Sequence, residues 1–161
     1  MTDTMKAIAA QESGGPDVLQ LTDVPTPEPG PDQVLVRTAA TGVNFIETYQ
    51  REGIYPVEHP FTPGSEGAGV VTAVGENVTS VSVGQRVATS EATRSYAEYF
   101  VVDAAKAMPV PDEMSDHDAA APPSRGSPPT TWCVPHSSSS PSTPRSSPRP
   151  PVAWAVWRFS S

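Results

Sequence analysis

Cysteine is nearly absent from this 161-residue sequence, which contains only Cys133. A single cysteine cannot form an intrachain disulfide, and it cannot build a cysteine-rich metal cage. No stretch of the chain approaches the roughly twenty apolar residues that a membrane-spanning helix needs, and residues 1–6 lack the apolar run of a signal peptide. We therefore expect a reduced, cytoplasmic protein without a membrane partner.

Acidic residues are absent from the last forty positions. The formal net charge is −8, and all 18 Asp and Glu residues lie at or before Asp118. The charged residues after Ala121 are Arg125, Arg145, Arg149 and Arg158. An acidic body repels phosphate groups at long range. We expect no nucleic-acid partner and no anionic-membrane partner.

The composition changes at Ala121. Residues 122–161 contain ten prolines and eleven serines but no Leu, Ile, Asp, Glu, Lys, Asn, Gln or Tyr. Such a segment cannot bury enough apolar area to offset the ordering of its backbone, which costs about 1–2 kcal/mol per residue. The sequence therefore predicts a folded domain over residues 1–121 and a disordered low-complexity tail over 122–161.

Short apolar or alternating runs, bounded by Gly, Pro, Asp and Asn, recur through the folded part. Such runs predict strands, and here they cover residues 6–10, 18–21, 33–37, 69–74, 83–88 and 96–102. Four prolines, from Pro25 to Pro31, predict a stiff extended connector instead of a strand. The spacing of the runs indicates a mostly β domain, built as a small antiparallel barrel or sandwich.

The best helical candidate is residues 44–51. Phe45, Ile46 and Tyr49 fall at i, i+1 and i+4, which places three apolar side chains on one side of a helix. Asn44 is suited to cap its N-terminus.

Two segments carry the candidate chemistry: residues 42–49, Gly-Val-Asn-Phe-Ile-Glu-Thr-Tyr, and residues 63–69, Pro-Gly-Ser-Glu-Gly-Ala-Gly. They resemble the substrate-site segments of the zinc-free medium-chain dehydrogenase/reductases, the NADPH:quinone oxidoreductases of the zeta-crystallin type. In the zinc-dependent relatives, Cys stands at the position of Asn44 and His at that of Ser65. Amide and hydroxyl groups are poor zinc ligands beside thiolate and imidazole, so we expect no catalytic zinc.

The resemblance also assigns roles to three residues. It implies that Asn44 lies near the nicotinamide end of NADPH, and that the Tyr49 hydroxyl donates to the oxygen of a quinone or enone. Glu47 stands where the family commonly has Asp, and it is expected to orient the helix start. The alternative is that Asn44 only caps the helix and Tyr49 only fills the core.

The segment 63–69 permits two interpretations. Its three glycines allow positive φ and close backbone approach, and Glu66 is of a type that backbone N–H groups can hold. In the family this stretch closes the substrate site, yet Ser65 and Glu66 serve equally well as structural residues, which is the interpretation we favour. Residues 64–67 are not a phosphate loop, because Lys and a following helix are lacking. His59, His117 and His136 lack metal-ligand spacing and are expected in turns or at the surface.

The tail has a second explanation in the genetic code. If one nucleotide is lost near codon 121, TCN serine codons are read as NTC, which encodes Leu, Ile, Val or Phe. In this frame residues 143–155 permit a strand followed by Gly-Gly-Val-Gly, which resembles the nucleotide-binding fingerprint of these reductases. We expect a frameshifted tail and a missing Rossmann domain.

The resemblance thus implies a GroES-like barrel over residues 1–121, from the N-terminal part of an enzyme that is a homodimer when intact. The parent activity would be metal-free hydride transfer from NADPH to a quinone-like small molecule. We expect this chain to be inactive alone, because most contacts to NADPH come from the missing part. The alternative is a non-enzymatic truncated fragment or a partner-binding barrel.

Overall fold

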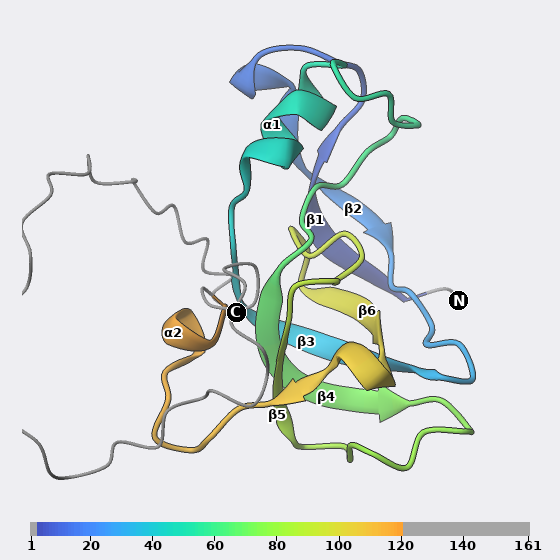
Figure 1. The fold of residues 1–161 in the computed structure, drawn as a ribbon. Coiled ribbons are helices and arrows are strands. Elements are labelled where there is room, and N and C mark those ends of the chain that lie inside the picture. The colour runs from blue at the N-terminus through green and yellow to red at the C-terminus, as the bar shows by residue number, and fades with distance from the viewer. Residues whose placement is uncertain (1–2, 121–161) are drawn as a thin grey trace, which may run out of the picture.

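The computed structural model describes residues 3–120 and has a mostly β fold with few helices (Figure 1). Its elements are β1 (Thr4–Ala10), the 3₁₀ turn η1 (Pro16–Val18), β2 (Leu19–Pro25), β3 (Gln33–Thr41), α1 (Phe45–Arg51), β4 (Gly67–Val74), β5 (Arg86–Thr89), β6 (Tyr99–Asp103), the 3₁₀ turn η2 (Ala104–Lys106), β7 (Met108–Pro109) and α2 (Asp116–Ala120). The expected fold class is confirmed. The tail of residues 122–161 lies outside the described residues, so its disorder and its reading frame stay predictions.

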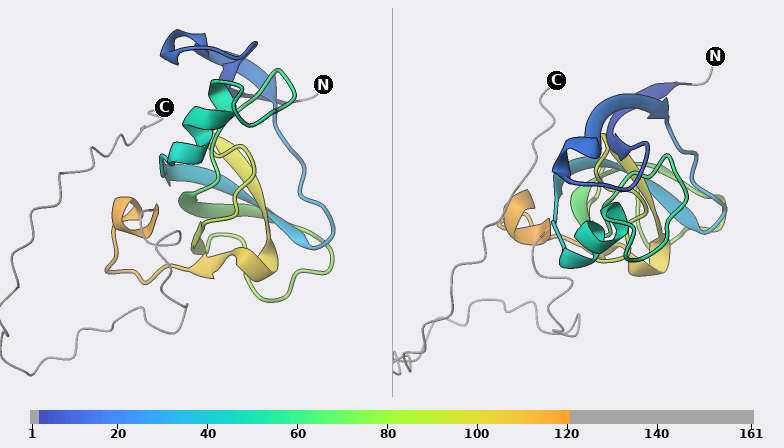
Figure 2. Two further views of the ribbon diagram at one scale, coloured as in Figure 1. Left: turned by 45° about the horizontal axis from the view of Figure 1, so that its top comes forward. Right: turned by 90° about the horizontal axis from the view of Figure 1, so that it is seen from above.

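The strands form two antiparallel sheets. One pairs β1 with β2, and the other has the order β6-β3-β4-β5-β7. β1 also hydrogen-bonds to segments outside its sheet, from Ile8 N to Tyr96 O at 2.8 Å and from Ala10 N to Phe61 O at 2.8 Å. Figures 1 and 2 show β1, β2 and α1 gathered at one end of the larger sheet.

The main core lies on one face of the five-stranded sheet. Val34 and Val36 alternate along β3 and are both fully buried, as the period of two in a strand requires. They pack with Phe100 of β6 and Val87 of β5 in one apolar cluster. Burial of these branched and aromatic side chains is the main stabilising contribution of the sheet.

The predicted runs overlap the strands but differ from them at their edges. The run at residues 83–88 begins as a turn, in which Gly84 has φ of +88° and the Gln85 N–H binds the Ser82 carbonyl at 3.1 Å, so β5 starts only at Arg86. Pro25 is the last residue of β2 and not part of the connector. An edge strand tolerates proline because one row of its N–H groups needs no partner.

The C-terminal helix α2 packs on the ends of β3 and β4. Its buried Ala119 and Ala120 contact Ala40 and Ala68 in a second apolar cluster. None of the helices between Asp3 and Ala120 has the length and hydropathy of a membrane span.

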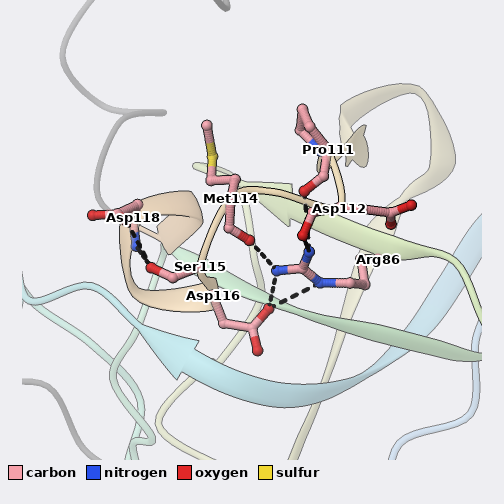
Figure 3. Close-up of polar contacts among 7 residues, drawn as sticks. All are labelled: Arg86, Pro111, Asp112, Met114, Ser115, Asp116 and Asp118. Atoms are coloured by element: carbon pink, nitrogen blue, oxygen red, sulfur yellow. Dashed lines mark hydrogen bonds and ion pairs between the residues drawn. The ribbon is translucent and has the colours of Figure 1, made fainter.

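Arg86 at the start of β5 holds the turn before α2 (Figure 3). Its guanidinium donates to Asp116 Oδ1 at 2.6 and 3.2 Å, to Met114 O at 2.6 Å and to Pro111 O at 3.1 Å. The Ser115 hydroxyl accepts the Asp118 N–H at 3.1 Å, in the manner of a helix N-cap. Arg86 therefore fixes the position at which the chain leaves the sheet.

Candidate functional site

The helix α1 begins and ends as expected, but its apolar side faces outward. Asn44 is the N-cap, with its carbonyl accepting the Glu47 N–H at 3.2 Å. Phe45, Ile46 and Tyr49 are 74%, 48% and 41% exposed, and the buried residue of the helix is Glu47. The alternative in which Tyr49 only fills the core is wrong.

The Glu47 carboxylate is the centre of the site. Oε2 accepts the Asn44 N–H at 3.0 Å and the Tyr96 hydroxyl at 2.7 Å. Oε1 accepts the Ser65 N–H at 3.1 Å and the Ser65 hydroxyl at 3.3 Å. Four donors satisfy this buried carboxylate, as a charge withdrawn from water requires. Glu47 thereby joins the start of α1 to both Ser65 and Tyr96.

Tyr96 is a member of the site that the sequence did not indicate. Burial raises the pKa of its phenol well above the ordinary value, and the neighbouring carboxylates of Glu47 and Glu66 raise it further. A phenolate beside two carboxylates would be strongly disfavoured. Tyr96 therefore stays a neutral donor to Glu47.

The segment 63–66 is fixed from the opposite side by residues 92–96. Gly64 has φ of +109°, and a Cβ there would lie 2.7 Å from the Tyr96 nitrogen, so this position requires glycine. The Glu66 carbonyl accepts hydrogen bonds from the hydroxyls of Thr41 and Ser95, each at 2.7 Å. The backbone of this loop is thus rigidly placed, which supports the structural interpretation.

Backbone N–H groups bind a different glutamate from the one expected. Glu66 is 3% exposed, but its Oε1 has no hydrogen-bond partner within residues 3–120. The expectation that backbone donors hold Glu66 is wrong, because the N–H of Ser65 points to Glu47 instead.

Asn44 caps the N-terminus of α1 and Tyr49 lies in its second half, and the two side chains have different surroundings. Asn44 lines a cavity of about 140 Å³, together with Glu47, Pro63 and Tyr96. Tyr49 packs edge-to-face against Tyr55, with 5.8 Å between ring centroids. Both tyrosines are exposed, at 41% and 52%, so the rings form an accessible aromatic surface. Tyr55 was missed because it lies beyond the helix, in a loop without periodicity.

A larger cavity of about 590 Å³ lies elsewhere, between β2 and the segment carrying Thr93 and Arg94. None of Asn44, Glu47 and Tyr49 lines it. Its size alone does not make it the candidate site, because it lacks the polar groups that converge on Glu47.

Asn44 and Ser65, the two residues compared with zinc ligands in the sequence, are both hydrogen-bonded to one carboxylate. The Asn44 and Ser65 N–H groups both donate to Glu47. Across residues 3–120, no group of three or more His, Cys, Asp or Glu side chains is arranged to hold a metal ion. His59 and His117 are exposed as expected, with His59 3.2 Å from the Ser13 hydroxyl, whereas His136 lies outside the described residues.

Comparison with known proteins identifies the family. Residues 30–112 match the alcohol dehydrogenase GroES-like domain. A quinone oxidoreductase of Pseudomonas aeruginosa is 45% identical over 118 residues, covering 72% of this chain and 36% of that protein. The human quinone oxidoreductase is 40% identical over 121 residues, covering 73% and 37%.

The fold agrees with solved structures of the same group. An Escherichia coli quinone oxidoreductase complexed with NADPH superposes with a TM-score of 0.70 at 34% identity, covering 73% of this chain and 36% of that structure. The chain thus spans a little over a third of the length of these relatives, at 36–37%. The chain belongs to the alcohol dehydrogenase GroES-like domain family and corresponds to the N-terminal part of the quinone oxidoreductases within it.

Proposed function

We propose that this chain is the substrate-side portion of an NADPH-dependent quinone oxidoreductase that reduces a quinone or enone without a metal. The observation that carries the proposal is the exposed aromatic pair of Tyr49 and Tyr55, at the helix that Asn44 caps. Exposed aromatic rings of this kind are suited to stack on a flat, apolar ring, and the Tyr49 hydroxyl is a donor for a carbonyl oxygen.

We assign a role to each of Asn44, Tyr49 and Glu47. Asn44 supplies a carboxamide at the start of α1, on the nicotinamide side. Tyr49 supplies the donor for the acceptor oxygen. Glu47 is a positioning residue, since all four of its hydrogen bonds go to protein donors. It holds Asn44 and Ser65 where the reacting groups need them.

NADPH, when bound, supplies the hydride. Residues 3–120 fit its nicotinamide end through Asn44, but they do not fit its pyrophosphate. The glycine-containing segment 64–67 leads into the strand β4 and not into a helix, and it carries the buried carboxylate of Glu66. A carboxylate repels phosphate. We therefore expect the 161-residue chain to bind NADPH weakly or not at all, and to be inactive alone.

The second candidate is a non-enzymatic truncated fragment or partner-binding barrel, whose apolar side is left uncovered. The exposed side chains of Phe45 and Ile54, at 74% and 61%, favour this candidate. An exposed apolar patch commonly marks a protein interface. Intact subunits of the family would bury it against their own second domain or a partner.

Quinone binding separates the two candidates. The purified chain is titrated with 1,4-naphthoquinone, and binding is followed by the NMR signals of the tyrosine rings. We expect saturable binding that is weakened in Tyr49→Ala and Asn44→Ala. Val83→Ala, which removes an exposed apolar side chain from the turn before β5, serves as the control. Binding that is equal in all four proteins contradicts the proposed site and favours the partner-binding candidate.

A further inference from the structure

One oxygen of the buried Glu66 carboxylate, Oε1, has no hydrogen-bond partner within residues 3–120. The residue is 3% exposed. Its carbonyl accepts hydrogen bonds from the hydroxyls of Thr41 and Ser95. Glu47, the other buried glutamate, has four donors. A buried charge without compensation is strongly unfavourable, so Glu66 requires a partner.

No cation between Asp3 and Ala120 serves as that partner. The lysines and arginines in this range are Lys6, Arg37, Arg51, Arg86, Arg94 and Lys106. Four of them are paired with other acids: Asp23, Glu52, Asp116 and Glu91. Arg37 and Arg94 are exposed, and neither forms an ion pair with Glu66. The compensating charge must come from outside these residues.

The space around the carboxylate lies beside Gly42. A Cβ on residue 42 would collide with Glu66 Oε2 and approach the Glu66 Cβ to 3.0 Å, so the absence of a side chain there leaves room for the carboxylate. Gly42 precedes α1, in the link that follows β3. The carboxylate therefore lies next to the chain that carries Asn44.

The described residues end at Ala120, which lies close to Glu66 in the fold. The strand register pairs Ala40 with Ala68 and Thr41 with Gly67, the residue after Glu66. Ala119 and Ala120 of α2 pack on Ala40 and Ala68. The polypeptide that follows α2 thus starts near Glu66.

We propose that Glu66 is the receptor carboxylate for a lysine or arginine side chain carried by the polypeptide that follows α2 in the full-length relatives. This chain spans 36–37% of those relatives, and we assign the cation to the part they have in addition. The pairing would join the two parts through a buried charge beside Gly42, in the link that leads to α1. The proposal rests on the family and not on quinone reduction, so a failure of the quinone titration leaves it intact.

The first test uses the 161-residue chain itself. Glu66→Gln removes an uncompensated charge while keeping the shape of the side chain. We expect the midpoint of urea unfolding to rise by about 0.5 M or more. Glu76→Gln, an exposed glutamate in the turn after β4, is the matched control and is expected to leave the midpoint unchanged. A midpoint that falls in Glu66→Gln shows a partner within this chain, including residues 122–161, and overturns the proposal. An unchanged midpoint overturns it as well.

The second test supplies the missing cation. Ethylguanidinium and ethylammonium are added to the chain, with tetramethylammonium as a cation without N–H donors, and the amide NMR signals of Gly42 and Gly67 are followed. We expect saturable shifts with the two donors, a smaller response to tetramethylammonium, and no saturable shift in Glu66→Gln. Identical shifts in the wild-type chain and in Glu66→Gln, or no saturable shift in either, contradict a receptor role for this carboxylate.

Discussion

The Tyr96 hydroxyl donates a 2.7 Å hydrogen bond to the Glu47 carboxylate, although the two residues lie 49 positions apart. Both side chains are 5% exposed. The bond joins the first turn of α1 to the segment that leads into β6. Together with the bonds from Glu47 to Asn44 and Ser65, it brings the two sequence segments of the candidate site into one arrangement.

Removal of the Tyr96 hydroxyl tests the contribution of this bond. Tyr96→Phe leaves the buried Glu47 oxygen with one donor fewer, and we expect the free energy of unfolding to fall by about 1–3 kcal/mol. Urea unfolding followed by circular dichroism measures it. Tyr99→Phe, in a half-buried tyrosine of β6, is the control and should change stability by less than about 0.5 kcal/mol. Equal losses of stability in the two variants would show that the Tyr96–Glu47 hydrogen bond does not stabilise the fold more than an ordinary tyrosine hydroxyl does.

The raised pKa of Tyr96 predicts a loss of stability at high pH. The ordinary phenol pKa is 10.0, and burial beside Glu47 raises the pKa of Tyr96 well above it. Above pH 10 the unfolded chain releases a proton that the folded chain retains, so the free energy of unfolding falls as pH rises. Tyr96→Phe should show a shallower decline between pH 9 and about 11.5 than the wild-type chain. Parallel declines would mean that Tyr96 ionises equally in the folded and unfolded states.

Neutralisation of Glu47 should cost more than neutralisation of an exposed glutamate. Glu47→Gln turns one acceptor oxygen into an NH₂ group, which then faces N–H or O–H donors. We expect a loss of about 2–3 kcal/mol in the free energy of unfolding, measured by chemical denaturation. Glu52→Gln at the C-terminus of α1 is the control, and its surface pair with Arg51 contributes about 0–1 kcal/mol. A loss no larger than that of Glu52→Gln would exclude Glu47 as the centre of the site.

Because Phe45 of α1 is largely exposed, replacing this aromatic residue with alanine should have little effect on stability. Phe45 is 74% exposed, so Phe45→Ala should change the free energy of unfolding by less than about 0.5 kcal/mol. Phe100→Ala, in the fully buried phenylalanine of β6, should cost about 3–5 kcal/mol. Both are read from thermal or urea unfolding. A cost near that of Phe100→Ala would place Phe45 in the core and contradict the orientation of the helix.

The sequence indicated most of the β framework. The alternating run around Val34 and Val36 predicted β3 correctly, because the period of two reflects one buried face. The start of β5 was missed, since Val83 fits an apolar run while Gly84 is needed for a turn. Hydrophobic pattern alone does not separate a strand from the turn that precedes it.

The helix α1 shows a different limit of prediction from the sequence. Its bounds followed from Asn44 and the apolar spacing, but the apolar side chains are exposed and Glu47 is buried. Apolar residues at helical intervals indicate an apolar face of the helix. They do not indicate whether this chain, another domain or another protein covers that face. The burial of Glu47 depends on donors from Ser65 and Tyr96, which are distant in sequence.

The role of Arg86 was also invisible in the sequence. Its acceptors, among them Asp116 and the carbonyl of Met114, lie about thirty positions away in a turn without a recognisable motif. Only the folded chain brings them around one guanidinium (Figure 3).

A titration of the purified 161-residue chain with NADPH, followed by nicotinamide fluorescence and by calorimetry, tests the central claim most directly. We predict millimolar or undetectable affinity and no NADPH oxidation when a quinone is added, because in our proposal the described residues contact only the nicotinamide end of the cofactor. Micromolar affinity, or quinone-dependent NADPH oxidation that Asn44→Ala abolishes, would contradict the account, because it would show that this chain binds the cofactor on its own.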